Sequence, residues 1–211
     1  MLKDKCALVT GSTQGLGSAM AEQLAAQGCH VMLSGFGDSA EIERQRRHLE
    51  DSHGARALHH EADLGVPSQI TDLVETAERT FGAVDIVINN AVVRHFSPLD
   101  DFKTEEWDRT LAVNLSAAFH TARLSLSGMR RRDFLPRLVA NARHRTAAGG
   151  IHGREGFGAR RGDRSFMASR QPSGRFVAMD GVAALAAFLC GPGGRDITGA
   201  ALPIDGGWSA S

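Results

Sequence analysis

The sequence predicts an α/β protein built on a Rossmann-like, doubly wound parallel sheet. Through the first 125 residues, short apolar runs typical of strands alternate with amphipathic runs typical of helices. Such alternation places helices on both faces of a parallel sheet joined by right-handed crossovers. A glycine-rich turn at residues 11–17 separates the first strand candidate from the first helix candidate. The length of 211 residues is enough for one core, so we expect a single domain over 1–211.

The elements of the first half follow from hydrophobic periodicity. The helix predicted over 67–81 places Ile70, Leu73, Val74 and Ala77 on one face, which is the spacing of an amphipathic helix. The strand predicted over 84–88 is rich in β-branched residues. In chain order we expect strand 6–10, helix 19–27, strand 30–33, helix 41–51, strand 57–60, helix 67–81 and strand 84–88, with sheet order 3-2-1-4.

The second half contains fewer clear elements. A long helix is expected over 104–125 with Thr104 as its N-cap, and a fifth strand over 138–141. An apolar helix over 182–190 ends at a Gly-Pro-Gly-Gly run, and a final strand is expected over 200–204.

The segment 143–170 differs from the rest of the chain. Between Arg143 and Arg164, fifteen of twenty-two residues are Arg, Gly or Ala, and only Ile151 and Phe157 are large and apolar. Neither helical nor strand periodicity is visible there, so we expect an irregular segment. The predicted α/β sheet is therefore truncated in its C-terminal part.

Composition excludes several classes of partner. Twenty-four basic and twenty-four acidic residues cancel, so no global charge recruits nucleic acid or a membrane. The cysteines Cys6, Cys29 and Cys190 are scattered, which is typical of reduced thiols and makes a metal site unexpected. No apolar leader or run of about 18 apolar residues is visible, so we expect a cytoplasmic protein.

The glycine turn predicts a dinucleotide site. Glycines after a strand and before a helix let the backbone bring a diphosphate against the helix N-terminus, where unpaired N–H groups favour an anion. The end of the second strand, residues 34–38, offers no Arg or Lys for a 2′-phosphate. We therefore expect NAD rather than NADP as the cofactor.

Specific motifs resemble the short-chain dehydrogenase/reductase family. The run Thr10-Gly11-Ser12-Thr13-Gln14-Gly15-Leu16-Gly17 is similar to the family's TGxxxGxG, and Asn89-Asn90-Ala91 to its NNAG, with Val92 in place of the last glycine. Within the family, residues 35–38, 114–121, 171–173 and 205–208 resemble the 3-hydroxybutyrate dehydrogenases. The resemblance covers about 1–142 and 170–211, and it implies oxidation or reduction of a small hydroxy or keto acid.

The resemblance implies a role for each matching residue. Asn114 would be the catalytic-site asparagine that bends its helix and holds a water of the proton relay, although a purely structural helix-bending role is equally open. Arg94 and His95 follow the fourth strand and would face a substrate carboxylate. The cofactor would be held by Gly11, Ser12, Thr13, Gln14, Gly15, Leu16, Phe36, Asp63, Leu64, Asn89, Asn90 and Ala91.

The residues that catalyse proton transfer in this family have no counterpart. The family uses a Tyr, a Lys four residues later and a Ser about a dozen residues earlier, whereas this chain has no Tyr and its only lysines are Lys3, Lys5 and Lys103. Arg143 stands where the Ser is expected. The expected enzyme is therefore inactive or nearly so, and the alternative is a non-catalytic dinucleotide-binding or interaction protein on the same fold.

A reading-frame shift explains the anomalous segment. Residues 143–145 and 151–156 can be encoded by codons that, read one nucleotide later, give Val-Thr-Gly and Tyr-Thr-Ala-Ala-Lys-Ala, the family's sequences around its Ser and its YxxxK. The shifted spacing is several residues too short, so a deletion must accompany the shift. The rival interpretation is a real basic loop for a polyanion, which its lack of interleaved aromatics disfavours.

The resemblance also bears on assembly. The family forms homo-oligomers through the helix expected at 104–125 and the catalytic helix, so assembly is doubtful for this chain. Loss of the second helix would expose the apolar residues Leu111, Leu115, Phe119 and Leu126.

Overall fold

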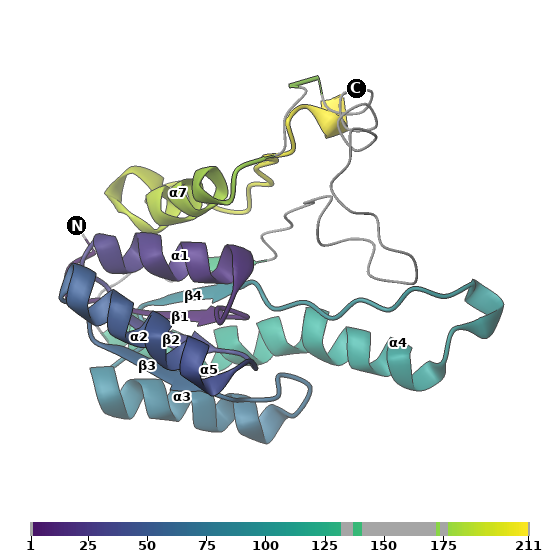
Figure 1. The fold of residues 1–211 in the computed structure, drawn as a ribbon, viewed down its shortest axis with the longest axis horizontal. Coiled ribbons are helices and arrows are strands. Elements are labelled where there is room, and N and C mark those ends of the chain that lie inside the picture. Colours follow the sequence, from purple (N-terminus) through teal and green to yellow (C-terminus); the bar gives the residue numbers. More distant parts are fainter. Residues whose placement is uncertain (1, 132–136, 141–171, 174–176, 211) are drawn as a thin grey trace.

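The computed structural model describes residues 2–131, 137–140, 172–173 and 177–210, which form a central sheet between two layers of helices (Figure 1). The strands are β1 (Cys6–Thr10), β2 (His30–Ser34), β3 (Ala57–His60), β4 (Ile86–Asn89) and β5 (Arg137–Ala140). The helices are α1 (Gly15–Ala26), α2 (Ser39–His53), α3 (Pro67–Phe81), α4 (Thr104–Leu111), α5 (Ala117–Arg131) and α7 (Met179–Cys190), with a π-helical turn over Ala112–Ser116. Single 3-10 turns cover Leu99–Asp101, Pro192–Gly194 and Trp208–Ala210.

The sheet is parallel and has the predicted order. Its strands follow one another as β3-β2-β1-β4-β5, with Ala7 opposite Val31 on one side and Ile86 on the other. The fifth strand, expected over 138–141, spans Arg137–Ala140 and pairs with β4. The prediction of a doubly wound parallel sheet is thus confirmed.

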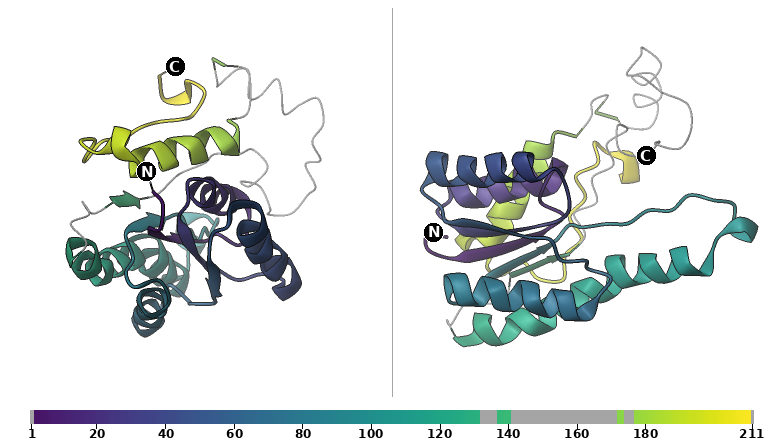
Figure 2. Two further views of the ribbon diagram at one scale, coloured as in Figure 1. Left: turned by 90° about the vertical axis from the view of Figure 1, so that its left-hand side faces the viewer. Right: turned by 60° about the horizontal axis from the view of Figure 1, so that its bottom comes forward.

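Both faces of the sheet are buried, because successive side chains of a strand point to opposite sides. In β1, Leu8 joins a core cluster with residues of α3 and α5, whereas Ala7 and Val9 join a cluster with residues of α1 and α7. Figure 2 shows the two layers, with α1, α2 and α7 on one face and α3 and α5 on the other. The inward face of α3 contains the four residues predicted from its periodicity.

The central strand is also held from its N-terminal end. The carboxylate of Asp85, which is fully buried, accepts the Cys6 N–H at 2.9 Å and lies 3.4 Å from Lys5 Nζ. All three cysteines are buried thiols outside any disulfide, and burial above all raises the pKa of the Cys29 thiol to about 12. These thiols therefore behave as core side chains and not as nucleophiles.

The long helix expected over 104–125 is present with two differences. It is a rod of α4, the π-helical turn and α5, and it runs on to Arg131. Thr104 is its first helical residue and not its N-cap; Lys103 precedes it and makes no side-chain cap hydrogen bond. The predicted cap is therefore wrong by one position.

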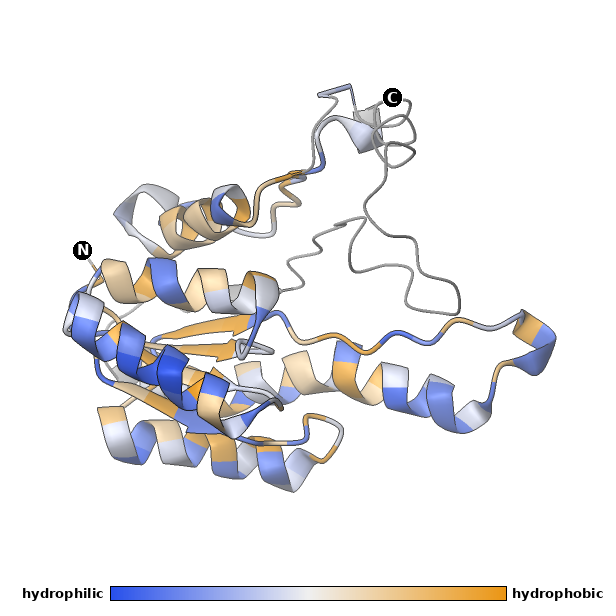
Figure 3. Cartoon of the chain, viewed as in Figure 1, coloured by the Kyte–Doolittle hydropathy of each residue, from blue (hydrophilic) through white to orange (hydrophobic). Residues whose placement is uncertain are grey.

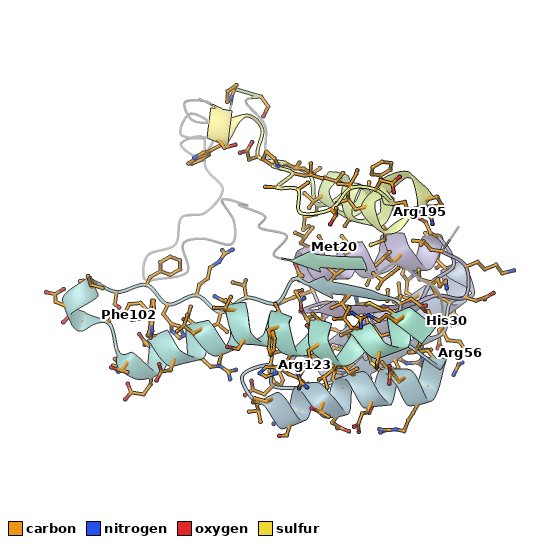
Figure 4. All side chains as sticks on the ribbon, turned by 180° about the vertical axis from the view of Figure 1, so that it is seen from behind. Met20, His30, Arg56, Phe102, Arg123 and Arg195 are labelled. Atoms are coloured by element: carbon orange, nitrogen blue, oxygen red, sulfur yellow. The ribbon has the colours of Figure 1, made fainter. Side chains whose placement is uncertain are left out.

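The α4 end of this rod projects beyond the sheet together with the segment that follows β4 (Figure 1). None of the residues of α4 is buried. Figure 4 shows Phe102 at the far end of this projection, remote from Met20 in the core. The π-helical turn lies where the rod leaves the body of the molecule.

An apolar stripe follows the rod, as the sequence predicts for most of these residues. The exposed fractions are 37% for Leu111, 65% for Leu115 and 62% for Phe119. Leu126, also expected to be exposed, is instead partly buried against the core cluster that contains α3. Figure 3 shows orange near the middle of the rod, whereas its projecting α4 end is mostly blue.

The C-terminal elements are only partly as predicted. Helix α7 packs against α1, with Ala183 and Ala187 beside Met20 and Leu24 in one cluster. The strand expected over 200–204 is not formed, and these residues are irregular. A strand needs a neighbour to satisfy its backbone groups, and the sequence contains no candidate for the strand beside which the family lays this segment. The anomalous segment 143–170 lies outside the described residues.

Within the described ranges, no helix is long and apolar enough to cross a membrane.

Candidate functional site

The predicted glycine turn is built by close contact between two loops at the carboxyl ends of β1 and β4. Gly11 adopts φ +63°, and a Cβ at this position would lie 2.9 Å from Ala91 Cα. A Cβ on Gly17, in the first turn of α1, would lie 2.6 Å from Asn90 Nδ2 and closer still to Gly11 O. Only glycine fits at either position, since a larger residue at Gly11 would push the turn away from Ala91 and one at Gly17 would push it away from α1.

Thr10 and Asn90 hold the turn against β4. Thr10 Oγ1 accepts the N–H groups of Asn90 at 3.0 Å and Ala91 at 3.1 Å, and it lies 3.3 Å from Ile88 O, to which it donates. The Asn90 side-chain amide donates to Thr10 O and Gly11 O, both at 3.0 Å. Asn90 therefore shapes the cofactor turn, in addition to the ribose contact that the resemblance implies.

Ser12 and Gln45 fix the turn from the other side. The Ser12 hydroxyl is buried; it donates to Val9 O at 2.7 Å and accepts the Ser34 N–H at 3.0 Å. Gln45 of α2 donates to Ser12 O at 2.8 Å and to Ser18 Oγ at 2.9 Å. Both side chains make the turn rigid before any ligand arrives.

The first turn of α1 is left open for an anion. Its N-cap, Gln14, makes no side-chain cap hydrogen bond, and no acidic residue lies in the first turn. The N–H groups at this end therefore lack side-chain partners and carry the positive end of the helix dipole. They face a cleft of about 520 Å³. Its lining is Gly11, Thr13, Gln14, Gly15, Leu16, Gly17, Ser34, Gly35, Phe36, Ala62, Leu64, Asn90, Ala91, Val92, Val93, Arg94, Arg109, Val113 and Met179.

Most of the predicted site residues lie in this lining. The cleft brings together Gly11, Thr13, Gln14, Gly15, Leu16, Phe36, Leu64, Asn90, Ala91 and Arg94. Ser12, Asp63, Asn89, His95 and Asn114 are outside the lining. Each of these five makes other protein contacts in this structure, and the roles that the resemblance implies for them stay predictions.

Asp63 and Asn89 are turned toward protein partners. Asp63 Oδ1 accepts the Gly65 N–H at 2.8 Å and lies 2.7 Å from Arg109 Nη1. Desolvation favours the neutral acid, but the hydrogen bonds from Gly65 and Arg109 outweigh it and lower the Asp63 pKa. Asn89 is buried, and its Oδ1 accepts the Thr121 hydroxyl at 2.8 Å.

Asn114 holds the irregular segment that follows β4. Its Oδ1 accepts the Val93 N–H at 2.8 Å, and its Nδ2 donates to Val93 O at 2.9 Å. Asn114 lies in the π-helical turn that interrupts the α-helical rod, and the bend expected there stays a prediction. Both ends of the amide are occupied by backbone, and these contacts favour the structural role that the sequence left open. His95 Nδ1 lies 3.8 Å from Glu106 on α4.

Three lining residues come from elements that the sequence did not connect to the site. Arg109 and Val113 come from the α4 rod, and Met179 comes from the start of α7. No motif marks them, because their proximity depends on the angle of the rod and on the docking of α7. In the sequence, Arg109 and Asp63 appear only as two opposite charges far apart in the chain.

Among the described residues, the lining offers two guanidinium groups for an anion but contains no carboxylate, imidazole, lysine or tyrosine. Its only ionisable side chains in the described part of the chain are Arg94 and Arg109. Lys5 lies before β1, at the opposite end of the sheet, and Lys103 precedes α4. The described part of the lining therefore suits an anionic ligand such as a diphosphate.

Replacing Thr10 tests whether the turn depends on its hydroxyl. Thr10→Val keeps the shape but leaves the Asn90 and Ala91 N–H groups without their acceptor, so we expect a loss of about 1–3 kcal/mol in the free energy of unfolding. The change also loosens the diphosphate loop and should weaken NADH binding. Urea denaturation and NADH titration measure the two effects, with Thr71→Val, a surface helix position, as the control. An unchanged unfolding midpoint for Thr10→Val would contradict this assignment.

Comparison with known proteins identifies the family. Residues 5–134 match the short chain dehydrogenase family. The chain is 33% identical over 259 aligned positions to D-beta-hydroxybutyrate dehydrogenase of Cupriavidus necator, covering 100% of both proteins. It is 31% identical over 255 positions to a protein of the same name from Rhizobium meliloti, covering 98% of this chain and 99% of the relative. Because the first alignment is longer than the chain, that relative contains residues that this chain lacks.

Solved structures agree in fold. A short chain dehydrogenase from Burkholderia cenocepacia in complex with NADP is 26% identical, covers 99% of both chains and superposes with a TM-score of 0.79. L-sorbose reductase from Gluconobacter frateurii, at 22% identity and a TM-score of 0.86, shares the fold over 99% of this chain and 98% of its own. The glycine turn, the sheet order and these matches lead to one conclusion: the chain belongs to the short-chain dehydrogenase family.

Proposed function

We propose that this chain is an NAD-binding member of the family, descended from a 3-hydroxybutyrate dehydrogenase, that has lost ordinary catalytic turnover. The observation that carries the proposal is the preformed cleft at the N-terminus of α1. There, the turn over Gly11–Gly17 is locked by Thr10, Asn90 and Gln45 before any ligand binds. A rigid set of N–H groups at a helix N-terminus suits a diphosphate.

The end of β2 favours NAD over NADP. Residues 34–38 contain no basic side chain, and Asp38 places a carboxylate there that accepts the Glu41 N–H at 2.9 Å. The arginines of the adjacent helix are paired with carboxylates, Arg44 with Glu41 and Arg46 with Glu43 and Glu50. A 2′-phosphate would meet a like charge and no unpaired guanidinium at this edge. Solved relatives include complexes with NADP and NADPH, so this preference is specific to the present chain's residues.

A small hydroxy or keto acid is the substrate class that the cleft supports. Arg94 follows β4, lines the cleft and is exposed, so its guanidinium is available to a carboxylate. His95, the second predicted substrate residue, faces Glu106 and not the lining. The substrate proposal therefore rests on Arg94 and on the two relatives named D-beta-hydroxybutyrate dehydrogenase.

Titration with reduced cofactors tests the binding proposal. We expect NADH to bind at a single saturable site and at least about tenfold more tightly than NADPH, a difference of about 1.4 kcal/mol. Fluorescence of the bound nicotinamide and calorimetry measure both affinities on the same preparation. Equal or tighter binding of NADPH would refute the cofactor preference, and absence of saturable binding of either would refute the binding proposal itself.

A second function, an interaction protein on the same fold, is favoured by one observation. The apolar stripe of Leu111, Leu115 and Phe119 is open to solvent along the projecting rod. The titration separates the two functions, because an interaction protein does not require NADH. Monomeric behaviour in sedimentation at high protein concentration, together with saturable NADH binding, would leave only the first.

A further inference from the structure

Three metal-binding side chains meet between α1 and α2, away from the cleft. Glu22 lies in α1, and His48 and His53 lie in α2. Glu22 Oε1 is 3.3 Å from His48 Nε2 and 2.5 Å from His53 Nε2. One oxygen and two imidazole nitrogens thus converge, and all three ligand atoms lie within 4.8 Å of one another.

We propose that Glu22, His48 and His53 form a binding site for Zn²⁺ or a similar first-row divalent cation. Two imidazoles and a carboxylate are a donor set that such ions prefer. Bonds of about 2.0–2.2 Å in a tetrahedron place neighbouring ligand atoms about 3.3–3.5 Å apart. The His48–Glu22 separation already has this value, and the His53–Glu22 contact opens by less than about 1 Å, a side-chain adjustment.

The surroundings orient the ligands. His48 Nδ1 lies 3.1 Å from Ser52 Oγ, so a ring that donates its Nδ1–H to the hydroxyl presents the Nε2 lone pair to the ion. Such a partner on the distal nitrogen is typical of metal-bound histidines. His53 is the last residue of α2, where the negative end of the helix dipole favours a cation.

Exposure shows where the fourth ligand goes. The His53 side chain is 21% exposed and Glu22 36%, whereas His48 is 59% exposed. The site is therefore covered by protein on the His53 side and open to solvent on the His48 side. Water completes the coordination from the open side, as in other three-ligand sites.

A hydrogen-bonded surface cluster without affinity for metal is the competing explanation. The nearby arginines of α2 are compatible with both a metal site and a hydrogen-bonded cluster, because Arg46 and Arg47 are each paired with Glu43. The ligands come from two helices, and Glu22 is 26 and 31 residues from the histidines. A bound ion would therefore cross-link α1 to α2, which a hydrogen-bonded cluster does far more weakly.

The cross-link predicts a stability effect that does not depend on the dinucleotide. A ligand that binds only the folded state stabilises it in proportion to the logarithm of its concentration. Zinc should therefore raise the melting temperature of the tag-free chain whether or not NADH binds. This separates a failure of the metal site from a failure of the proposed function.

The test uses ZnCl₂ in competition with a chromogenic chelator, and CoCl₂ for the visible spectrum of the bound ion. We expect one zinc per chain, a higher melting temperature and the intense bands of four-coordinate cobalt. The double variant His48→Gln/His53→Gln should weaken zinc binding at least about tenfold, because even changes outside the coordination shell cost 10–100-fold. Glu22→Gln keeps size and hydrogen bonding and should also weaken it.

A matched control is His60→Gln, since His60 Nε2 also lies 3.1 Å from a carboxylate, that of Asp72, but without a third ligand. It should bind zinc as the unmodified chain does. Unchanged affinity and an unchanged cobalt spectrum in both Glu22→Gln and the double variant would overturn the proposal. So would the absence of stoichiometric zinc binding by the unmodified chain.

Discussion

With NAD and D-3-hydroxybutyrate, this chain should form NADH about 10²–10⁴-fold more slowly than the Cupriavidus necator relative. This is the factor that general acid–base catalysis typically contributes. The nicotinamide takes the hydride, but the protein must accept the proton from the alcohol oxygen. None of the described lining residues is a Tyr, Lys, His or carboxylate that could accept this proton. The family's tyrosine cannot be replaced from elsewhere in a chain that contains no Tyr.

The assay requires two readouts on one preparation. Initial rates of NADH absorbance give turnover, and NADH titration shows that the cleft is intact. Binding without turnover separates lost chemistry from a lost fold. Turnover in the ordinary range of about 1–10³ per second would show that a proton acceptor exists outside the described lining.

Gly17→Ala should abolish NADH binding and lower the free energy of unfolding by about 1–3 kcal/mol, the usual cost of overpacking. The added Cβ would lie 2.6 Å from Asn90 Nδ2 and even closer to Gly11 O. The Gly11 carbonyl is held by Asn90, so α1 must move away from the turn. That displacement takes the N–H groups of α1 out of register with a diphosphate.

Gly181→Ala is the matched control. Gly181 is also a helical glycine, in α7, but a Cβ there would have nothing within 4 Å. The change should stabilise the chain by about 0.5–1 kcal/mol, because alanine loses less backbone entropy in a helix. NADH affinity should not change. Similar loss of binding in both variants would mean that the contact with Gly11 is not the cause.

The fold was predictable where local pattern and burial agree. Strand β1 is a continuous apolar run because it is buried on both faces, and α3 shows its inner face through Ile70, Leu73, Val74 and Ala77. The glycine spacing predicted the turn, because the close packing there leaves no room for a Cβ at Gly11 or Gly17. Such features can be recognised from the local sequence without knowledge of the tertiary structure.

The remaining features depend on distant partners. Asp63 matches a cofactor-contacting position, yet its carboxylate pairs with Arg109, which only the angle of the α4 rod brings near. Asn114 matches a catalytic position, but the π-helical turn gives both ends of its amide to Val93. The segment 200–204 has the composition of a strand but is irregular and pairs with none of the described strands, and composition alone cannot supply such a partner.

The packing of α7 on α1 has a consequence for how the chain is made. The units from β1 to α5, in which β2 pairs with β1 and β3 and β4 returns to β1, can form while synthesis continues. Helix α7 closes against Met20 and Leu24, residues made at the very start, and so it arrives last. Until the ribosome releases the final residues, the outer face of α1 stays uncovered. Premature termination before residue 179 should therefore produce a chain that chaperones retain.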